Sequence, residues 1–329
     1  MNDPDILNVL IIGCGNIAGG LDSTLGEDGS PLTHAGAYKL NPHFKIQACI
    51  DISQHKCDLF AENWGIPHSF TSIDQVAQLD IVFDVISICS PTSCHFADLN
   101  ACLALSPRLI FCEKPVTGSV KDTAKIKAVC DHAGVLLAVN YVRRWDDRII
   151  SLKKEINANK RGALRSVIGC YNKGILNNGS HLVDLLYFLI GEMVIKHIGQ
   201  PNYDFFLNDP SVCVTLEADS SVPILLVPAV NATDYSVFEI QMIFENGMLT
   251  MLDGGLRWVE RRTGDSGIFN GYRVLDAGVE SQGGYLAAMS HAVDNIWRTL
   301  TKGDPLNSSG DTALIAQALC EKISIASRG

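Results

Sequence analysis

The sequence predicts an α/β protein: an N-terminal domain with a doubly wound parallel sheet, then an α+β domain with a large, mostly antiparallel sheet. Three observations support this. Short apolar runs alternate with helix-length segments up to about residue 140, a glycine-rich turn follows the first run, and strand-like runs separated by turn residues dominate after residue 143. A chain of 329 residues has room for two domains, which we place at residues 1–142 and 143–329.

The strand candidates of the first domain are mostly apolar and do not strictly alternate, which is typical of strands buried on both faces of a parallel sheet. They cover residues 9–12, 44–50, 81–89, 109–112 and 135–139. Between them, residues 53–63, 94–105 and 119–132 have helical length and periodicity. Right-handed βαβ crossovers would give a doubly wound sheet.

The second domain begins with a charged helix at residues 146–161 and an amphipathic helix at residues 180–190, which Gly191 ends. Four runs rich in strand formers follow, at residues 211–216, 222–227, 237–244 and 248–252. Two C-terminal helices, at residues 285–301 and 311–326, close the chain. This order predicts one antiparallel sheet with a face left to cover, and hence a homodimer or homotetramer built through it.

The composition excludes several classes of protein. Lysine and arginine total 26 against 36 acidic residues, so the formal charge of −10 offers no basic surface for nucleic acid or anionic lipid. No apolar run approaches the roughly 18 residues that span a bilayer, and the acidic start of the chain is unlike a signal peptide. The 11 cysteines are scattered without a C-x-x-C pair, which argues against a disulfide framework or a zinc ribbon. We therefore expect a cytoplasmic protein without a metal.

A glycine-rich turn follows the first strand, with the sequence Gly13-Cys14-Gly15-Asn16-Ile17-Ala18. In a dinucleotide site, the first glycine permits the tight turn, the second admits a pyrophosphate close to the backbone, and the alanine lets helix and strand pack closely. Small residues also suit any tight βα turn. The position after the first strand favours the dinucleotide site.

Asp51 ends the second apolar strand, where a carboxylate can accept both ribose hydroxyls and repel a 2′-phosphate, so it favours NAD over NADP. It lies 36 residues after Gly15 instead of about 20, which we attribute to an insertion at residues 21–32. The alternative is a capping aspartate at a strand end.

Two more strand ends carry residues that we assign to cofactor binding, because ligands of open parallel sheets bind at the carboxyl edge. They are Ser90, Pro91 and His95 after one strand, and Glu113 and Lys114 after the next. Beside an oxidised nicotinamide the pKa of the lysine should fall, which fits it for proton exchange with a substrate hydroxyl. A simple pair between Lys114 and Glu113 is the alternative.

The last candidate is His181, near the start of the helix at residues 180–190. Asn178 or Ser180 can cap this helix, and Asp184 shares a face with His181 opposite a leucine stripe. A histidine there can act as an acid or base, although a lone histidine is often a packing residue. A metal site at His181 is disfavoured, because no second histidine lies at ligand spacing from it.

Together these motifs resemble the glucose–fructose oxidoreductase, inositol dehydrogenase and rhizopine-catabolism (Gfo/Idh/MocA) family of NAD(P)-dependent dehydrogenases. The likeness covers essentially the whole chain and rests on the glycine-rich turn, on Glu113-Lys114-Pro115 and on Gly179-Ser180-His181-Leu182-Val183-Asp184. It implies that the first domain is a Rossmann domain that binds NAD(P), and that the second binds the substrate and forms oligomers through an open sheet. It also implies hydride transfer between a nicotinamide and a secondary alcohol or ketone of a sugar, cyclitol or nucleotide sugar.

The resemblance also implies residue roles. Lys114 would orient the reacting group and assist its proton transfer, His181 would be the acid/base, and Asn140 and Arg144 would line the cofactor or substrate site. Many members have an aspartate at the position of Asn177, and an amide cannot relay a proton. We place Asn177 in the catalytic and substrate-binding group, but its identity leaves two alternatives open.

One alternative is a cofactor- or sugar-sensing protein that kept the fold and lost catalysis. The other is an NAD-dependent glycosidase of the same fold.

Overall fold

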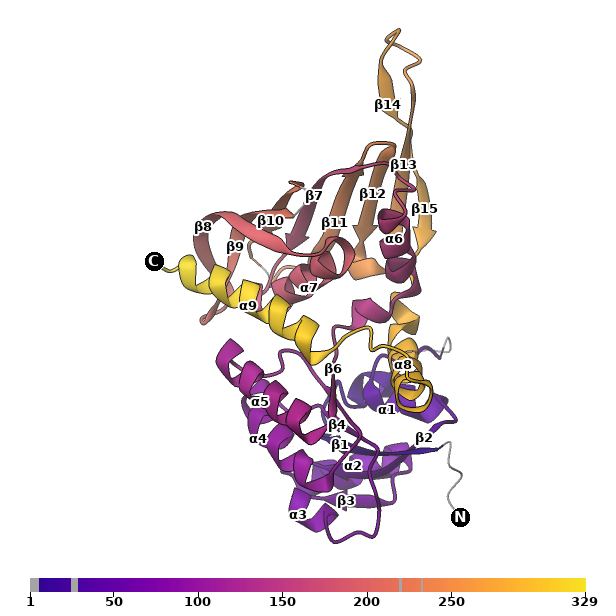
Figure 1. Cartoon of the computed structure of the whole chain (residues 1–329), viewed down its shortest axis with the longest axis vertical. Coiled ribbons are helices and arrows are strands. Elements are labelled where there is room, and N and C mark those ends of the chain that lie inside the picture. Colours follow the sequence, from indigo (N-terminus) through magenta and orange to yellow (C-terminus); the bar gives the residue numbers. More distant parts are fainter. Residues whose placement is uncertain (1–5, 25–28, 219–220, 232) are drawn as a thin grey trace. The chain divides into compact units, whose positions relative to one another are not determined.

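The computed structural model describes residues 6–24, 29–218, 221–231 and 233–329 (Figure 1). They form two compact units. Unit 1 contains residues up to Trp145 and residues 286–315; unit 2 contains residues 146–285 and 316–329. The predicted division at residue 142 placed the whole C-terminal part in the second domain, whereas residues 286–315 group with unit 1.

Unit 1 is built on a six-stranded sheet of order β3-β2-β1-β4-β5-β6 in which every described pair of neighbours is parallel. The strands are β1 (Leu7–Ile12), β2 (Phe44–Ile50), β3 (His68–Phe70), β4 (Val85–Ile88), β5 (Leu109–Cys112) and β6 (Leu136–Val139). This is the order of a Rossmann fold, and it confirms the predicted fold class. β3 escaped prediction because three half-buried residues carry no apolar run.

Helices cover both faces of this sheet. They are α1 (His34–Leu40), α2 (Gln54–Trp64), α3 (Ile73–Val76), α4 (Thr92–Cys102), α5 (Val120–Ala133) and α8 (Ala288–Lys302), with short 3-10 turns η1 (Gly20–Thr24), η2 (Leu103–Leu105), η3 (Val142–Trp145) and η6 (Tyr285–Ala287). Figure 1 shows α4 beside α5, and α1 beside α8. The apolar residues Met289, Val293 and Ile296 of α8 join the same core cluster as Tyr38 and Trp145. That burial explains why α8 belongs to unit 1.

The glycine-rich turn does not open a long helix. One turn forms, with the Leu21 N–H donating to the Asn16 carbonyl at 3.0 Å, and leads into η1 before α1 begins at His34. The Thr33 side chain caps α1 by accepting from the Gly36 N–H. Part of the proposed insertion at residues 21–32 lies outside the described residues, as do residues 1–5 at the start of the chain.

Unit 2 contains a nine-stranded mixed sheet of order β14-β13-β12-β11-β7-β10-β9-β8, with β15 also paired to β13. The strands are β7 (Leu164–Tyr171), β8 (Met193–Phe206), β9 (Asp209–Ala218), β10 (Pro223–Pro228), β11 (Phe238–Phe244), β12 (Gly247–Leu252), β13 (Arg257–Asp265), β14 (Arg273–Leu275) and β15 (Val279–Gln282). Only the β7–β10 pair is parallel among the described pairs, so the predicted mostly antiparallel sheet is confirmed. Buried and half-buried residues alternate along β11 and β12, so one face is better covered than the other.

The helices of unit 2 are α6 (Asp147–Asn157) and α7 (Gly179–Ile190), with a π-helical turn η4 (Gly174–Asn178), the short η5 (Asp253–Gly255), and α9 (Gly310–Ala326), which starts in unit 1. α7 packs on β7, and a side chain at Gly169 would bring its Cβ to 2.8 Å from Leu182 Cδ2. The small residue therefore lets the leucine stripe of α7 approach the sheet. Among the described residues, no helix is long and apolar enough to cross a membrane.

Candidate functional site

The glycine-rich loop brings the ends of β1 and β4 into contact. Gly13 has φ +90, and a Cβ there would lie 2.5 Å from the Ser90 backbone nitrogen, so only glycine fits. Its N–H donates to the Ile50 carbonyl at 2.7 Å. A Cβ on Gly15, by contrast, would meet nothing within 4 Å. The space above Gly15 is therefore open, as a loop that admits a pyrophosphate requires.

Asp51 links this loop to the start of α2. Its Oδ2 accepts the Cys14 N–H at 3.0 Å, and its Oδ1 accepts the Ser53 N–H at 3.0 Å. The residue that caps α2 is Ser53, whose hydroxyl accepts the Lys56 N–H, so Asp51 supports the turn before the helix and does not cap it. Each carboxylate oxygen has a second lone pair, so these bonds leave acceptor capacity for ribose hydroxyls.

A cavity of about 240 Å³ opens beside Asp51 at the carboxyl ends of β1, β2 and β4. It is lined by Ile12, Gly13, Ile50, Asp51, Ile52, Thr71, Ser72, Ile73, Ser90, Pro91, Cys94, Asp98 and Ala101. β1 and β4 are neighbours, and the chain adds strands on one side of β1 before it crosses to β4 and continues on the other side. Open α/β sheets bind ligands at such a point, where the strand order reverses. Four predicted cofactor residues, Gly13, Asp51, Ser90 and Pro91, therefore share one cavity.

Asp98 is a cavity residue that the sequence analysis missed. The Ser90 hydroxyl donates to its Oδ2 at 2.5 Å. The sequence feature that could have identified Asp98 is its position eight residues after Ser90, on α4, the helix that starts at the cavity. No lining residue carries a positive charge, whereas two are carboxylates.

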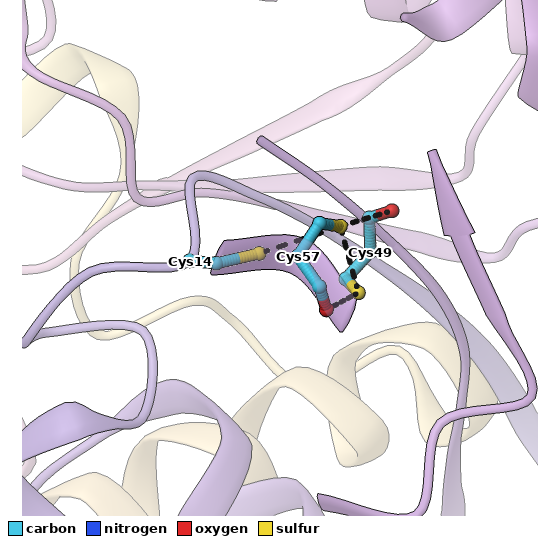
Figure 2. A group of neighbouring side chains, drawn as sticks. All are labelled: Cys14, Cys49 and Cys57. Atoms are coloured by element: carbon cyan, nitrogen blue, oxygen red, sulfur yellow. Dashed lines mark hydrogen bonds between the residues drawn. The ribbon is translucent and has the colours of Figure 1, made fainter. Parts of the chain in front are cut away.

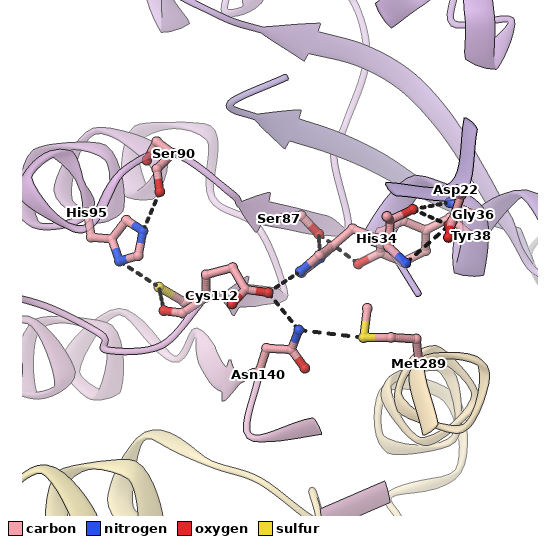
Figure 3. A network of polar contacts seen from close by, with 12 residues as sticks. Asp22, His34, Gly36, Tyr38, Ser87, Ser90, His95, Cys112, Asn140 and Met289 are labelled. Carbon is pink, nitrogen blue, oxygen red and sulfur yellow. Dashed lines mark hydrogen bonds and ion pairs between the residues drawn. The ribbon is translucent and has the colours of Figure 1, made fainter. Parts of the chain in front are cut away.

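A buried network of polar side chains lies at the carboxyl end of β5 (Figure 3). His34 Nε2 lies 3.0 Å from Glu113 Oε1, and the Asn140 amide donates to the same oxygen at 2.6 Å. His34 Nδ1 lies 3.2 Å from the Ser87 hydroxyl, which also bonds the Tyr38 hydroxyl at 2.9 Å. His34 was not a sequence candidate, because nothing local connects it to Glu113.

The Glu113 carboxylate is held in its ionised form. Burial alone would raise its pKa, but hydrogen bonds from His34 and Asn140, together with the charges of His34 and Lys114, outweigh burial and lower the pKa below its usual value. Lys114 therefore does interact electrostatically with Glu113, as the simpler alternative supposed. The glutamate's hydrogen-bond partners in this network, however, are His34 and Asn140.

Asn140 provides a test of whether the residues fit a nicotinamide cofactor. Its Oδ1 is buried and has no hydrogen-bond partner among the described residues. A buried acceptor without a partner is rare and indicates that a donor belongs there. This orphaned acceptor, the open space at Gly15 and the acidic cavity together fit an NAD-type dinucleotide.

His95 holds the loops that carry Ser90 and Lys114. The His95 ring is buried, with Nε2 at 2.8 Å from the Ser90 carbonyl oxygen and Nδ1 at 2.9 Å from the Pro115 carbonyl oxygen. Lys114, which precedes Pro115 across a cis peptide bond, is half-buried at the end of β5. These bonds give His95 a positioning role. Direct contact of His95 with the cofactor stays a prediction.

Three further candidates differ in exposure. Arg144 is only 2% exposed, and its Nη1 donates to the Asn307 carbonyl at 3.4 Å, so it ties η3 to the segment before α9. Asn16 is exposed on the glycine-rich loop, and Ile17 is half-buried against the core. Substrate contact by Arg144 stays a prediction.

In unit 2, His181 lies in the first turn of α7 and is half-buried. Its ring makes an edge contact with Phe238 of β11, with ring centroids 6.4 Å apart. Asp184 is 2% exposed and does not share a solvent-facing side with His181. α7 therefore buries more of its circumference than the leucine stripe. A shared polar role of His181 and Asp184 stays a prediction.

A residue outside α7, Asp209, supports the turn η4 that leads into this helix. The Asp209 carboxylate accepts the N–H groups of Leu176 and Asn177, each at 2.8 Å. Burial raises the pKa of Asp209 although these N–H bonds oppose it. The predicted cap by Asn178 or Ser180 was wrong: neither side chain caps, and the Ser180 hydroxyl donates to the Asn177 carbonyl at 2.7 Å.

Asn177 lies in the π-helical turn η4, four residues before His181. Its side-chain amide donates to the Lys173 carbonyl at 3.3 Å, and its backbone N–H bonds to Asp209. The side-chain amide therefore makes a structural hydrogen bond, and unlike a carboxylic acid it has no acidic proton to transfer. A catalytic role for Asn177 stays a prediction.

The comparisons with known proteins match this fold. Residues 7–141 match the model of the oxidoreductase family with an NAD-binding Rossmann fold. An inositol 2-dehydrogenase of Rhizobium meliloti is 25% identical over 88% of this chain and 91% of its own length. The uncharacterized oxidoreductase YrbE of Bacillus subtilis is 36% identical, but the match covers 34% of this chain and 32% of YrbE.

A second Bacillus subtilis relative, scyllo-inositol 2-dehydrogenase (NADP(+)) IolW, is 25% identical over 34% of this chain and 36% of its own length. The match to YrbE and to IolW thus spans about a third of their lengths.

Solved structures share the fold over nearly the whole chain. The NADPH-dependent oxidoreductase from Desulfitobacterium hafniense superposes with a TM-score of 0.81 at 16% identity, covering 99% of this chain and 96% of that one. The WlbA dehydrogenase of Bordetella pertussis, solved with NADH and UDP-GlcNAcA, gives a TM-score of 0.77 at 16% identity, covering 99% and 96%. At these identities the likeness establishes the fold.

Proposed function

Because this chain belongs to the Gfo/Idh/MocA oxidoreductase family, with an NAD-binding Rossmann fold in residues 7–141, we propose that it transfers hydride between a nicotinamide and a secondary alcohol or ketone of a sugar, cyclitol or nucleotide sugar. The observation that carries the proposal is the cavity at the carboxyl ends of β1, β2 and β4, where Asp51 and the glycine-rich loop meet.

We propose NAD as the preferred cofactor. Asp51 and Asp98 line the cavity without a lining cation, so a ribose 2′-phosphate would meet two carboxylates and no counter-charge. The NADP-dependent relative IolW shows that members of this group of relatives differ in preference. The proposed preference for NAD over NADP is therefore supported by the negative charge of the cavity and not by membership of the family.

Bound NAD would supply the hydride acceptor. Glu113, kept ionised, would place negative charge beside Lys114 and favour its ammonium form, which orients a substrate oxygen and can donate to it. His181, fixed by Phe238, would take up or release the substrate's hydroxyl proton. Arg144 and Asn177 would contribute substrate contacts.

The substrate class is supported by the names of relatives. Inositol 2-dehydrogenases are among them, and WlbA was solved with a nucleotide sugar. We therefore place inositols, free sugars and nucleotide sugars first among the candidates. The half-covered face of the unit 2 sheet supports assembly as a homodimer or homotetramer.

The test is hydride transfer by the purified chain with NAD or NADP, followed by NADH fluorescence, over a panel of inositols, sugars and nucleotide sugars. Lys114→Ala should reduce turnover by about 10²-fold or more, the usual size of a proton-transfer contribution, and leave NAD affinity unchanged. Lys125→Ala, on the exposed part of α5, is the matched control.

Three results would contradict the proposal. NAD binding without turnover over the whole panel would favour the sensing protein. Release of a free sugar without net NADH would favour the glycosidase. Full activity of Lys114→Ala would remove Lys114 from the reaction.

A further inference from the structure

Three cysteine sulfurs meet beneath the glycine-rich loop of unit 1 (Figure 2). Cys14 follows β1, Cys49 lies near the end of β2, and Cys57 lies in α2. The Sγ atoms of Cys49 and Cys57 are 3.3 Å apart, those of Cys14 and Cys57 are 3.8 Å apart, and all three lie within 4.8 Å of one another. Three separate elements therefore supply one sulfur each to the same point.

This spacing suits a bound metal ion. With metal–sulfur bonds of about 2.3 Å and tetrahedral angles, neighbouring sulfurs lie about 3.8 Å apart. The separation of Cys14 and Cys57 equals that value, the separation of Cys49 and Cys57 is 0.5 Å shorter, and the third pair lies within 4.8 Å. A disulfide would use only two of them.

The cluster lies largely away from solvent. Cys49 and Cys57 are fully buried, and Cys14 is half-buried. Cys49 and Cys57 belong to the apolar core cluster of unit 1, and Cys14 packs against it. An apolar shell of this kind controls the access of solvent to a bound metal ion.

We propose that Cys14, Cys49 and Cys57 bind one soft d¹⁰ metal ion, Cu⁺ or Zn²⁺. Soft thiolate ligands select these ions over harder ones. Binding forms three metal–sulfur bonds and releases the thiol protons to solvent, without electron transfer. The site does not depend on the oxidoreductase activity proposed above.

The site would also stabilise unit 1. A metal here would join the glycine-rich loop, β2 and α2, and a ligand that binds only the folded state raises stability by mass action. Thermal stability therefore provides a measurement of binding that is separate from activity. The sequence predicted no metal, because it contains no C-x-x-C pair: Cys49 and Cys57 are eight positions apart, and Cys14 is 43 positions from Cys57.

The experiment uses the full chain, reduced and kept free of oxygen. Titration with Co²⁺ as a spectroscopic probe should give one equivalent with an intense thiolate-to-cobalt charge-transfer band. Competition of Zn²⁺ with a chromogenic chelator, and of Cu⁺ with bathocuproine disulfonate, then identifies the preferred ion. The preferred ion should raise the unfolding temperature.

Two cluster variants and one control keep the test decisive. Cys57→Ser should weaken metal binding by more than about 100-fold, because even outer-shell changes cost up to that factor. Cys14→Ser, at the half-buried position, should do the same if Cys57→Ser does not fold. Cys213→Ser, an exposed thiol in unit 2, should bind like the wild type.

Equal metal binding by wild type and both cluster variants would overturn the proposal. So would a wild-type protein that takes up neither Co²⁺, Zn²⁺ nor Cu⁺. Mass spectrometry of unreduced protein that finds Cys49 joined to Cys57, with no metal uptake after reduction, would identify a redox pair instead.

Discussion

His34 and Glu113 form a buried pair 79 positions apart in sequence, with Nε2 and Oε1 3.0 Å from each other. The His34 side chain is fully buried and that of Glu113 is 14% exposed. Since Glu113 adjoins Lys114, the pair connects the start of α1 to the residue proposed to assist proton transfer. It therefore couples the stability of unit 1 to the charge beside Lys114.

Replacing His34 should destabilise the protein. His34→Ala leaves the Glu113 carboxylate with one hydrogen-bond donor fewer, and a hydrogen bond to a charged group contributes about 1.5–3 kcal/mol. Urea unfolding measures the change in the free energy of unfolding. His34→Gln keeps a donor of similar reach and should lose clearly less. Equal losses in both variants would mean that the hydrogen bond to Glu113 contributes little.

Stability should fall in acid because of Glu113. Its pKa is lower in the folded protein than the ordinary value of 4.5 expected in the unfolded chain. The ionised form thus stabilises the fold above pH 4.5, and this contribution is lost as the pH falls through the folded-state pKa. Unfolding free energies measured below pH 4.5 should decline more steeply for wild type than for Glu113→Gln. Parallel curves would contradict the assignment.

Two glycine variants should separate folding from cofactor binding. Gly15→Ala places its Cβ where no protein atom lies within 4 Å, so stability should stay close to wild type while NAD affinity falls by at least about tenfold. Gly13→Ala should lose both, because its Cβ would collide with the Ser90 backbone at φ +90. Calorimetric NAD titration and thermal unfolding provide the two readouts. Unchanged NAD affinity in folded Gly15→Ala would place the pyrophosphate elsewhere.

Cofactor preference should depend on Asp51. Asp51→Ala removes the proposed acceptor of both ribose hydroxyls, and hydrogen bonds to a charged group contribute about 1.5–3 kcal/mol. NAD affinity should therefore fall at least about tenfold, while NADP affinity falls less or rises. Asp74→Ala, on α3, is the control. An unchanged ratio of NAD to NADP affinity would leave Asp51 only its structural hydrogen bonds to the Cys14 and Ser53 N–H groups.

The turn that precedes His181 should depend on Asp209. Asp209→Ala leaves the Leu176 and Asn177 N–H groups without their acceptor, at a cost of about 2 kcal/mol. Turnover should fall further than stability alone explains, because His181 follows this turn, whereas NAD affinity should be unchanged. Asp234→Ala, at an exposed loop position, is the control. Wild-type turnover in folded Asp209→Ala would show that η4 does not position His181.

The local pattern of the sequence predicted most strands of the unit 1 sheet and one edge of that sheet, but not β3. Apolar runs with turn residues at their ends predicted β2 and β5 at their observed bounds, because burial on both faces of a sheet demands such runs. Gly13 and Asp51 could be assigned for the same reason, since residues that directly follow parallel strands must share the carboxyl edge.

The tertiary structure alone decided which distant side chains meet. The pairing of His34 with Glu113, the support of Asn177 by Asp209 and the convergence of the three cysteines all join separate elements. Such contacts depend on helix placement and side-chain direction, which periodicity in one segment does not encode. That is why the sequence indicated a cofactor edge but not the buried network behind it.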